Sequence, residues 1–405
     1  MPRLIRGRTT VFIYALLGVW GYVLYGFGPV VGLLRDEQHT SRGVASLHST
    51  AFAFGALIGG ATTPWLVRRY GRPATMWAGT LGTVVAVAAL CLVRPLPLTL
   101  AVSLLFGLIG TFLLSGIVSS LSDTHGDAAP AAISEANAVA CAIGAVAPVV
   151  VGATVGAGLG WRPGFAVGAG LFVILAIVGL VWQVRFPSAA APTVPMEHPA
   201  VPPAARSAAA GRLPRAYWLA FLVMGLCGSV EVSVNLWSAD LLRERAGMAP
   251  GQAAAAVSAV VGGMFLGRAL GARFALRYPP TTVLLGALGL SVGGFALFWL
   301  SMVPALGVAG LIVLGLGNAL HYPLAISIAL AAADGRPDLA ASRSAYAMAF
   351  AFGVAPFMLG GLADAAGVRW AFLLVPAMLA VAATVVMRLR RTAVIATPEP
   401  ALAVP

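Results

Sequence analysis

The chain has very few charged residues for its length. Of its 405 residues only 9% are charged, whereas a soluble domain carries about 25%. It contains no lysine, so its 25 basic residues are all arginine. A soluble fold of 405 residues cannot bury all the apolar surface of a chain that is 60% hydrophobic. The composition therefore excludes a soluble protein and predicts a chain that lies in a lipid bilayer.

Cysteine is also scarce, and catalytic motifs are absent. Cys91, Cys141 and Cys227 lie in apolar segments without CxxC spacing, so we interpret them as small buried side chains. We expect no metal site and no cofactor. The sequence has no phosphate loop, zinc motif or nucleophile elbow, so we also expect no catalytic residue and no enzyme.

The net charge of +12 comes from arginines at the ends of apolar segments. This pattern is typical of membrane orientation, and we expect no nucleic-acid partner. The first apolar run is too long for a secretory signal, so it is predicted to be an uncleaved helix. With a cytoplasmic N-terminus, 18 arginines lie inside and 7 outside. The bias predicts that both termini are cytoplasmic.

Twelve apolar runs are each long enough to span a bilayer. Their ranges are 9–34, 43–66, 74–94, 97–119, 132–158, 163–184, 216–241, 250–274, 281–302, 304–330, 341–364 and 367–389. Between the sixth and seventh runs, residues 186–214 are rich in proline and alanine and predict a cytoplasmic linker. The predicted domains are residues 1–185 and 215–391, each with six helices, followed by a disordered tail at 392–405.

The two predicted domains resemble each other at a fixed spacing. At an offset of 208 residues the matched pairs are Gly55 with Gly263, Gly59 with Gly267, Arg69 with Arg277, Gly107 with Gly315, Pro148 with Pro356, and Gly152 with Gly360. Single matches of small residues mean little in a chain rich in glycine, but a shared offset indicates two copies of one unit in the same orientation. Such internal repeats are typical of transporters.

These features together resemble the major facilitator superfamily over nearly the whole chain. The loop after the second run reads PWLVRRYGRP, and its Arg69, Gly71 and Arg72 match the family pattern G-x-x-x-D-R-x-G-R-R. Pro64 replaces the first glycine of the pattern, and Arg68 replaces its aspartate. The gating contact that this aspartate makes in the family is therefore in question for this half. The resemblance implies an all-α membrane protein of twelve helices in two pseudo-symmetric bundles. It also implies gating or conformational roles for Arg69, Gly71 and Arg72, and we predict such roles for Pro148 and Pro356 of the repeat. Arg268 is expected near the cytoplasmic end of its run, with a structural or gating role and not in substrate binding.

Glu231 is the clearest candidate for chemistry inside the membrane. It lies near the middle of the seventh run, where a charge costs at least ~2.5–3.5 kcal/mol and needs a reason. Asn235 follows at i+4, on the same helix face. A carboxyl there can bind and release a proton or contact a substrate. The alternative is a neutral carboxyl that is hydrogen-bonded between helices and fixes their packing.

Other polar residues are weaker candidates for a substrate or proton site. Asn318, His321 and Tyr322 share a helix face in the tenth run, and the resemblance places runs 1, 4, 7 and 10 around a central cavity. In the first run, Tyr22 and Tyr25 are candidates, although tyrosines also anchor helices at interfaces. In the fourth run, the hydroxyls of Thr111 and Ser115 can equally bond to their own backbone.

We therefore expect a secondary active transporter of a small solute that works by alternating access, with protons as the preferred energy source. Efflux of apolar, drug-like compounds and uncoupled facilitation are the alternatives within transport, and a membrane sensor is a remote one. We expect a monomer in a bacterial plasma membrane. Its partners would be the bilayer, a small-molecule substrate and protons.

Overall fold

The computed structural model describes residues 6–187, 213–275, 277–334 and 336–395. The described residues form helices and no strands, and twelve of these helical spans are long and apolar enough to cross a membrane. This confirms the predicted all-α membrane fold. The predicted linker and the predicted tail lie almost entirely outside the described residues.

The first half of the chain contains one short 3₁₀ turn at Gly126–Ala128 and a set of long α-helices. These are α1 (Arg8–Gln38), α2 (Arg42–Tyr70), α3 (Arg72–Leu92), α4 (Leu96–His125), α5 (Ala129–Gly144), α6 (Val146–Gly156) and α7 (Arg162–Val181). α5 and α6 together form one span that breaks just before Pro148. The break is expected because proline has no N–H to donate to the preceding turn.

The second half repeats this arrangement and begins after the linker. Its helices are α9 (Arg215–Ala246), α10 (Pro250–Ala256), α11 (Ser258–Ala275), α12 (Pro280–Leu300), α13 (Pro304–Ala331), α14 (Pro337–Gly353), α15 (Ala355–Ala366), α16 (Val368–Ala371) and α17 (Leu374–Ile395). A break just before Pro356 separates α14 from α15, at the position that the repeat matches to Pro148.

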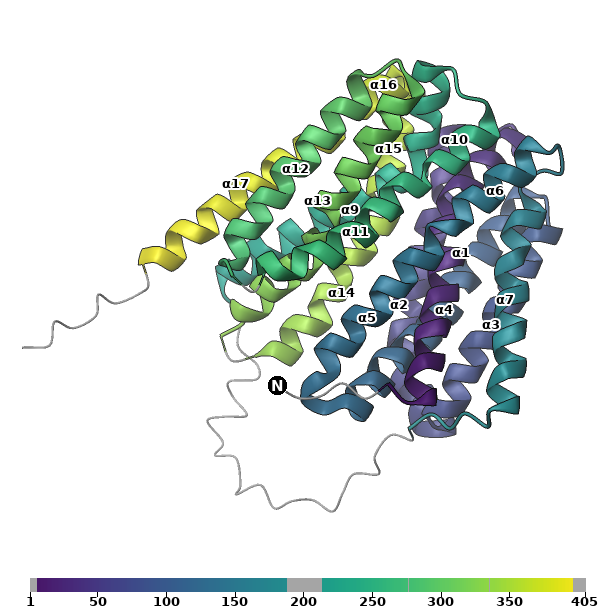
Figure 1. The fold of residues 1–405 in the computed structure, drawn as a ribbon, viewed down its shortest axis with the longest axis vertical. Coiled ribbons are helices and arrows are strands. Elements are labelled where there is room, and N and C mark those ends of the chain that lie inside the picture. The colour runs from purple at the N-terminus through teal and green to yellow at the C-terminus, as the bar shows by residue number, and fades with distance from the viewer. Residues whose placement is uncertain (1–5, 188–212, 276, 335, 396–405) are drawn as a thin grey trace, which may run out of the picture.

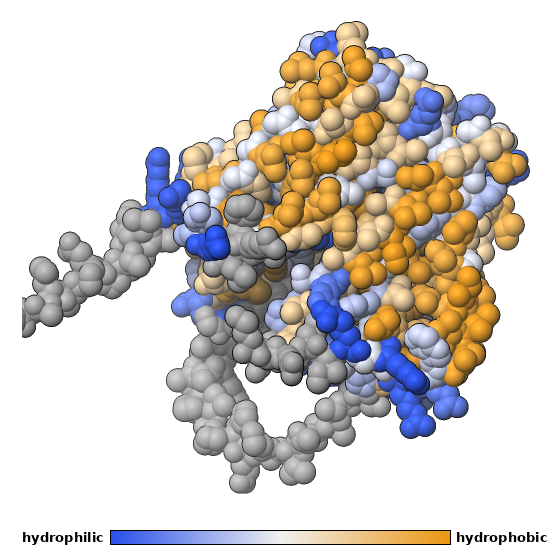
Figure 2. Space-filling model, in the orientation of Figure 1, coloured by the Kyte–Doolittle hydropathy of each residue, from blue (hydrophilic) through white to orange (hydrophobic). Residues whose placement is uncertain are grey.

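Each half contributes its first helix to the centre of the molecule. In α1 and α9, 78% and 72% of the spanning window is buried, against 33% in α7. The two halves stand side by side in Figure 1, and α1 packs against α9 between them. The outer surface is largely apolar along the helices (Figure 2), as expected where lipid replaces water. A site shared by the halves at the centre of the molecule would therefore include α1 and α9.

Candidate functional site

The two halves approach each other closely where α1 crosses α9. A Cβ atom at Gly28 would collide with Asn235 Oδ1 and would lie 2.7 Å from the main-chain oxygen of Asn235. Only glycine fits at this crossing, because it carries no Cβ. Tyr25, almost one turn earlier on α1, is thereby brought against α9.

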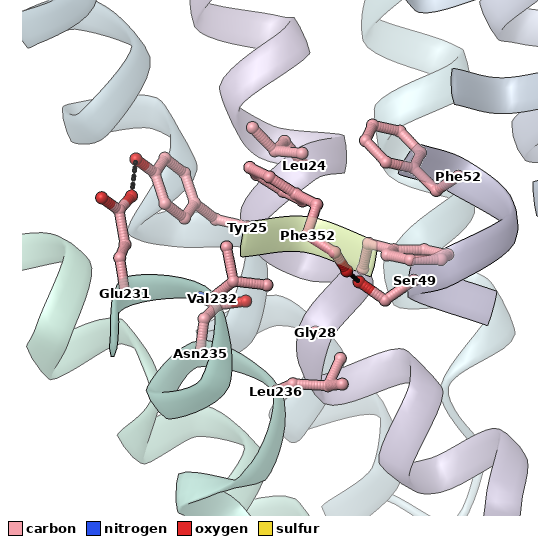
Figure 3. A pocket seen from close by; sticks show the side chains of 11 residues that line it. Leu24, Tyr25, Gly28, Ser49, Phe52, Glu231, Val232, Asn235, Leu236 and Phe352 are labelled. Atoms are coloured by element: carbon pink, nitrogen blue, oxygen red, sulfur yellow. Dashed lines mark hydrogen bonds between the residues drawn. The ribbon is translucent and has the colours of Figure 1, made fainter. Parts of the chain in front are cut away.

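A pocket lies beside this crossing, and Figure 3 shows a carboxyl and a phenol meeting on its wall. Tyr25 donates its hydroxyl hydrogen to Glu231 Oε1 over 3.4 Å. The cavity volume of the pocket is about 40 Å³. Its lining residues are Leu24, Tyr25, Phe27, Gly28, Ser49, Phe52, Glu231, Val232, Asn235, Leu236 and Phe352. The pocket is thus built from both halves, by α1, α2, α9 and α14.

The pocket wall combines aromatic rings with a few polar groups. Phe27, Phe52 and Phe352 supply apolar surface, and the Phe52 ring contacts each of the other two at a centroid distance of 5.9 Å. Asn235 Nδ2 is buried and has no hydrogen-bond partner among the described residues. A buried donor without a partner is costly, so it is a place where a ligand oxygen or water would bind favourably.

Arg268 of α11 joins Tyr25 and Glu231 in what we call the central cluster, with Cys141 as its fourth member. Arg268 Nη1 donates to the main-chain oxygen of Asn137 over 3.3 Å and also to Cys141 Sγ. The Tyr25 hydroxyl lies 3.8 Å from the same Cys141 Sγ. The cluster therefore links α1 and α5 of the first half to α9 and α11 of the second. Sequence reasoning expected Arg268 at the cytoplasmic end of its helix and missed this contact.

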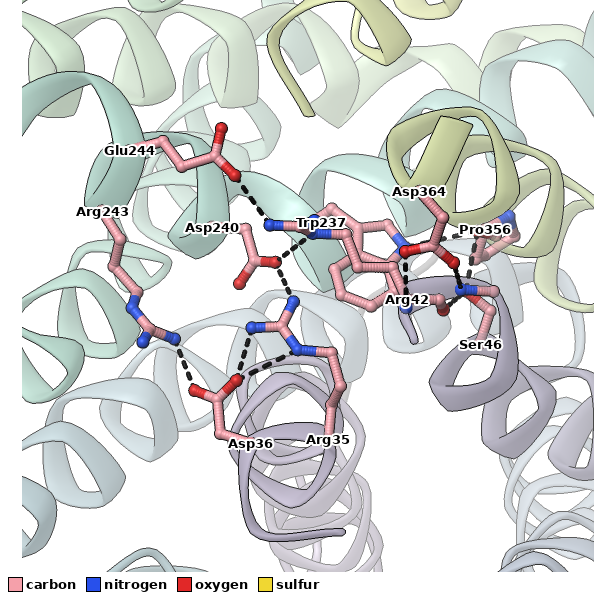
Figure 4. A network of polar contacts seen from close by, with 11 residues as sticks. Arg35, Asp36, Arg42, Ser46, Trp237, Asp240, Arg243, Glu244, Pro356 and Asp364 are labelled. Atoms are coloured by element: carbon pink, nitrogen blue, oxygen red, sulfur yellow. Dashed lines mark hydrogen bonds and ion pairs between the residues drawn. The ribbon is translucent and has the colours of Figure 1, made fainter. Parts of the chain in front are cut away.

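A network of ion pairs closes the interface at one end of the molecule (Figure 4). We call this the closed end; it carries the α1–α2 turn at residues 39–41. Asp240 of α9 accepts hydrogen bonds from Arg35 of α1 and from Arg42 Nε of α2, the latter over 2.8 Å. The Asp240 side chain is only 5% exposed. One buried carboxylate thus ties two helices of the first half to the second.

Two further ion pairs extend the network. Asp36 pairs with Arg243 at 2.6 Å, and Arg42 pairs with Glu244 at 2.7 Å. These two pairs and the two of Asp240 all join one half to the other at the closed end. The sequence does contain a signal for this network, because acidic residues and arginines lie together at the ends of the first and seventh runs. Their spacing, however, does not reveal which side chains pair with each other.

Pro356 lies at the same interface, where α2 contacts the break between α14 and α15. Its main-chain oxygen accepts hydrogen bonds from Ser46 Oγ at 2.9 Å and Trp237 Nε1 at 3.3 Å. Ser49 Oγ donates to the Phe352 oxygen over 2.6 Å. The predicted conformational role of Pro356 remains a prediction, but its location at the interface between halves is consistent with it.

The polar residues of the tenth run lie away from this pocket. Asn318 and His321 are each 2% exposed, and His321 Nε2 is 3.2 Å from Ser291 Oγ of α12, within the second half. Both side-chain polar atoms of Asn318 lack partners among the described residues. Tyr322 is 39% exposed. In the part of the chain that the structure describes, no group of three His, Cys, Asp or Glu side chains could hold a metal ion.

The remaining candidates of the first half make contacts within that half. Tyr22 donates to the Gly164 oxygen of α7 over 2.7 Å, so it points away from the pocket that Tyr25 lines. Thr111 donates to the Gly107 oxygen of its own helix over 2.9 Å, and Ser115 is half-buried on the same helix. Tyr25 is therefore the one candidate of runs 1 and 4 that the structure brings to Glu231.

The loop between α2 and α3 gains its acidic partner from another helix. Gly71 turns the chain with a φ of 84°, a conformation that favours glycine. Arg72 forms an ion pair with Asp123 near the end of α4, while Arg69 is exposed. Asp123 thus supplies a carboxylate to a loop that has Arg68 in place of the family's aspartate.

A family model described as the Major Facilitator Superfamily matches residues 11–350. No curated protein sequence matches the chain. Among solved structures, a bacterial homolog of the human lysosomal transporter Spinster, inward-facing and unoccupied, is similar with a TM-score of 0.73 and 16% identity. The alignment covers 97% of this chain and 99% of that one.

Two other solved transporters share the fold. A mutant of the nucleoside transporter NupG has a TM-score of 0.73 at 15% identity, covering 94% of this chain and 98% of that one. The peptide transporter POT, in complex with sulfate, has a TM-score of 0.70 at 16% identity, covering 97% and 96% of the respective chains. At such low identity these likenesses show the fold alone.

Proposed function

This chain belongs to the major facilitator superfamily, and we propose that it carries a small solute across the membrane by proton-coupled alternating access. Membership of this family makes it a transporter and not an enzyme. One observation carries the proposal. Glu231 meets Tyr25 across the two halves, on the wall of a pocket that both halves build. Movement of one half against the other would change the access of this carboxyl.

The arginine bias supports cytoplasmic termini, which puts the closed end on the outside of a bacterial plasma membrane. We propose that the ion pairs around Asp240 then close the pocket to the exterior, as expected of an inward-facing state. Alternating access requires these pairs to break when the outward-facing state forms.

Flux through proteoliposomes tests the proposal. Purified protein is reconstituted, a pH gradient is imposed, and uptake from a mixture of amino acids, sugars, nucleosides, monocarboxylates and amines is quantified by mass spectrometry. We expect at least one solute to accumulate with the gradient. Glu231→Gln should abolish accumulation but keep counterflow exchange, because the neutral amide cannot carry a proton.

Glu135→Gln is the matched control, since Glu135 pairs with Arg6 outside the pocket. Its accumulation should equal that of the native protein. Full gradient-driven accumulation by Glu231→Gln would remove Glu231 from the coupling step and leave it a packing role.

The aromatic lining of the pocket favours a second candidate, the export of apolar compounds. Leu24, Phe27, Phe52 and Phe352 contribute apolar side chains to the pocket lining. A cell line that expresses the protein would then tolerate apolar toxic compounds, and the tolerance would not depend on the pH gradient if transport is uncoupled.

A further inference from the structure

The central cluster contains one negative and one positive side chain. Glu231 of α9 supplies the carboxyl and Arg268 of α11 the guanidinium. Tyr25 contacts both Glu231 and Cys141, and Arg268 donates to Cys141, so these contacts join the two charged groups in one cluster. The other titratable groups that face Glu231 are Tyr25 of α1, Cys141 of α5 and Cys227 of its own helix. With an ionised Glu231 the cluster is neutral. Protonation of Glu231 leaves the positive charge of Arg268 uncompensated in a largely apolar environment.

Hydrogen-bond donors from three helices gather at this site. Tyr25 offers its hydroxyl hydrogen, Asn235 has a buried Nδ2 without a partner among the described residues, and Arg268 Nη1 contacts a main-chain oxygen and a thiol. The Glu231 carboxylate is the charged acceptor among them. When it is protonated, the cluster has no anionic acceptor left. A bound group with two acceptor oxygens and one negative charge would restore the balance.

We propose that the site binds a proton together with a monocarboxylate, and that Arg268 holds the carboxylate group. This inference rests on the proposed function and adds the substrate class to it. The proton on Glu231 removes the one negative charge of the cluster, and the substrate carboxylate replaces that charge beside Arg268. Proton and anion then enter as a neutral pair, so each favours the binding of the other.

The surroundings define the rest of the ligand. Phe27, Phe52 and Phe352 line the pocket beside the cluster, so the body of the substrate is apolar. Arg268 is the one arginine of the cluster, which suits a single carboxylate better than a dicarboxylate or a phosphate ester. A protonated amine is disfavoured, because it would add a second positive charge next to Arg268.

Binding of matched compounds tests the inference. Phenylacetate, phenylacetamide and phenethylamine share one body and differ in charge, and isovalerate, isovaleramide and isoamylamine form an aliphatic set. The shift in melting temperature of the full-length protein in detergent is titrated with each compound at about pH 5.5 and 7.5, where both acids stay mostly ionised. We expect the carboxylates to stabilise the protein, with an apparent Kd about tenfold lower at the acidic pH.

Variants separate the roles of the two charged groups. Glu231→Gln mimics the protonated carboxyl, so carboxylate binding should persist and lose its pH dependence. Arg268→Gln should abolish carboxylate binding, and Arg268→Lys should restore part of it. Arg8→Gln, which changes an exposed arginine at the start of α1, is the control and should bind as the native protein does. Gel filtration confirms that each variant is folded.

Three outcomes would overturn the inference. They are stabilisation by the amines in preference to the acids, undiminished carboxylate binding by folded Arg268→Gln, and no effect of any carboxylate on the native protein. If a neutral solute is still accumulated through Glu231, the proposed function stands without this substrate class. If carboxylates bind as expected but no gradient-driven uptake occurs, the carboxylate site is supported and the proposal of proton-coupled transport is refuted.

Discussion

At the scale of single residues, Asp240 carries the largest share of the closed-end contacts. It is almost fully buried and accepts hydrogen bonds from Arg35 and Arg42, both on the other half. Removing one partner of a buried ion pair typically costs about 3–5 kcal/mol, because the remaining charge is left uncompensated. Exposed pairs contribute less than about 1 kcal/mol. The pairs at this end are therefore unequal, and Asp240 decides how firmly the end is closed.

We predict that Asp240→Asn opens the closed end. In a background without native cysteines, Leu236→Cys places a thiol on the pocket wall. An impermeant maleimide added to intact cells should label this thiol at least tenfold faster when Asp240→Asn is also present, since about 1.4 kcal/mol corresponds to a factor of ten. Glu244→Gln changes a 45% exposed partner and should alter the rate little. Equal rates for the two variants would refute the role of Asp240.

The sequence identified Glu231 and Tyr25 as candidates but could not show that they meet. Their contact spans 206 positions and depends on Gly28, which lets α1 approach α9. Periodicity assigns a residue to a helix face, but which neighbour that face meets is decided by packing. His321 illustrates the limit, because its face was correctly described as polar while the side chain contacts Ser291 within the second half.

At the scale of helices, hydropathy predicted all twelve spans, but several helices are longer than predicted, α1 and α9 among them. α1 continues to Gln38 and α9 to Ala246, beyond the predicted ends at 34 and 241. The added turns carry charged residues, which lower the hydropathy of any window that includes them. They stay helical because their charges pair across the halves, as Asp36 does with Arg243.

The broken helix α14–α15 depends on α2 for its hydrogen bonds. Proline has no N–H, so Pro356 leaves the Phe352 oxygen without its usual helical donor, and Ser49 Oγ donates instead. We predict that Ser49→Ala lowers stability by about 1 kcal/mol, as is typical for one lost hydrogen bond. In a Pro356→Ala background, where the new alanine would supply the main-chain N–H, the same change should cost less.

A double-mutant cycle of thermal unfolding in detergent measures this coupling. Thr62→Ala provides the control, because Thr62 donates to the Ile58 oxygen of its own helix, away from the break. Independent effects of Ser49→Ala and Pro356→Ala would mean that the hydroxyl does not replace the missing donor.

At the scale of the whole molecule, the repeat predicted two similar units but not how they differ in their contacts. On one side of the interface, α2 presents hydroxyls to α14 and α15, through Ser49 and Ser46. On the other side, α6 meets α10 through glycines, because a Cβ at Gly152 would lie 2.3 Å from the Gly251 oxygen. Pseudo-symmetric helices thus use polar contacts on one side and close backbone packing on the other.

Rocking of rigid halves predicts that cross-links between them stop transport, whereas cross-links within a half do not. Ser46→Cys with Gly360→Cys joins α2 to α15 at the closed end, where a Cβ at position 360 would lie 2.6 Å from Ser46 Oγ. Oxidation of this pair should abolish solute uptake, and a reductant should restore it. Gly26→Cys with Ala147→Cys is the matched pair inside the first half, with Cβ atoms 3.2 Å apart, and its oxidation should leave uptake unchanged. Continued uptake with a complete disulfide between positions 46 and 360 would show that the halves need not separate at this end, and would exclude alternating access by rocking about the pocket.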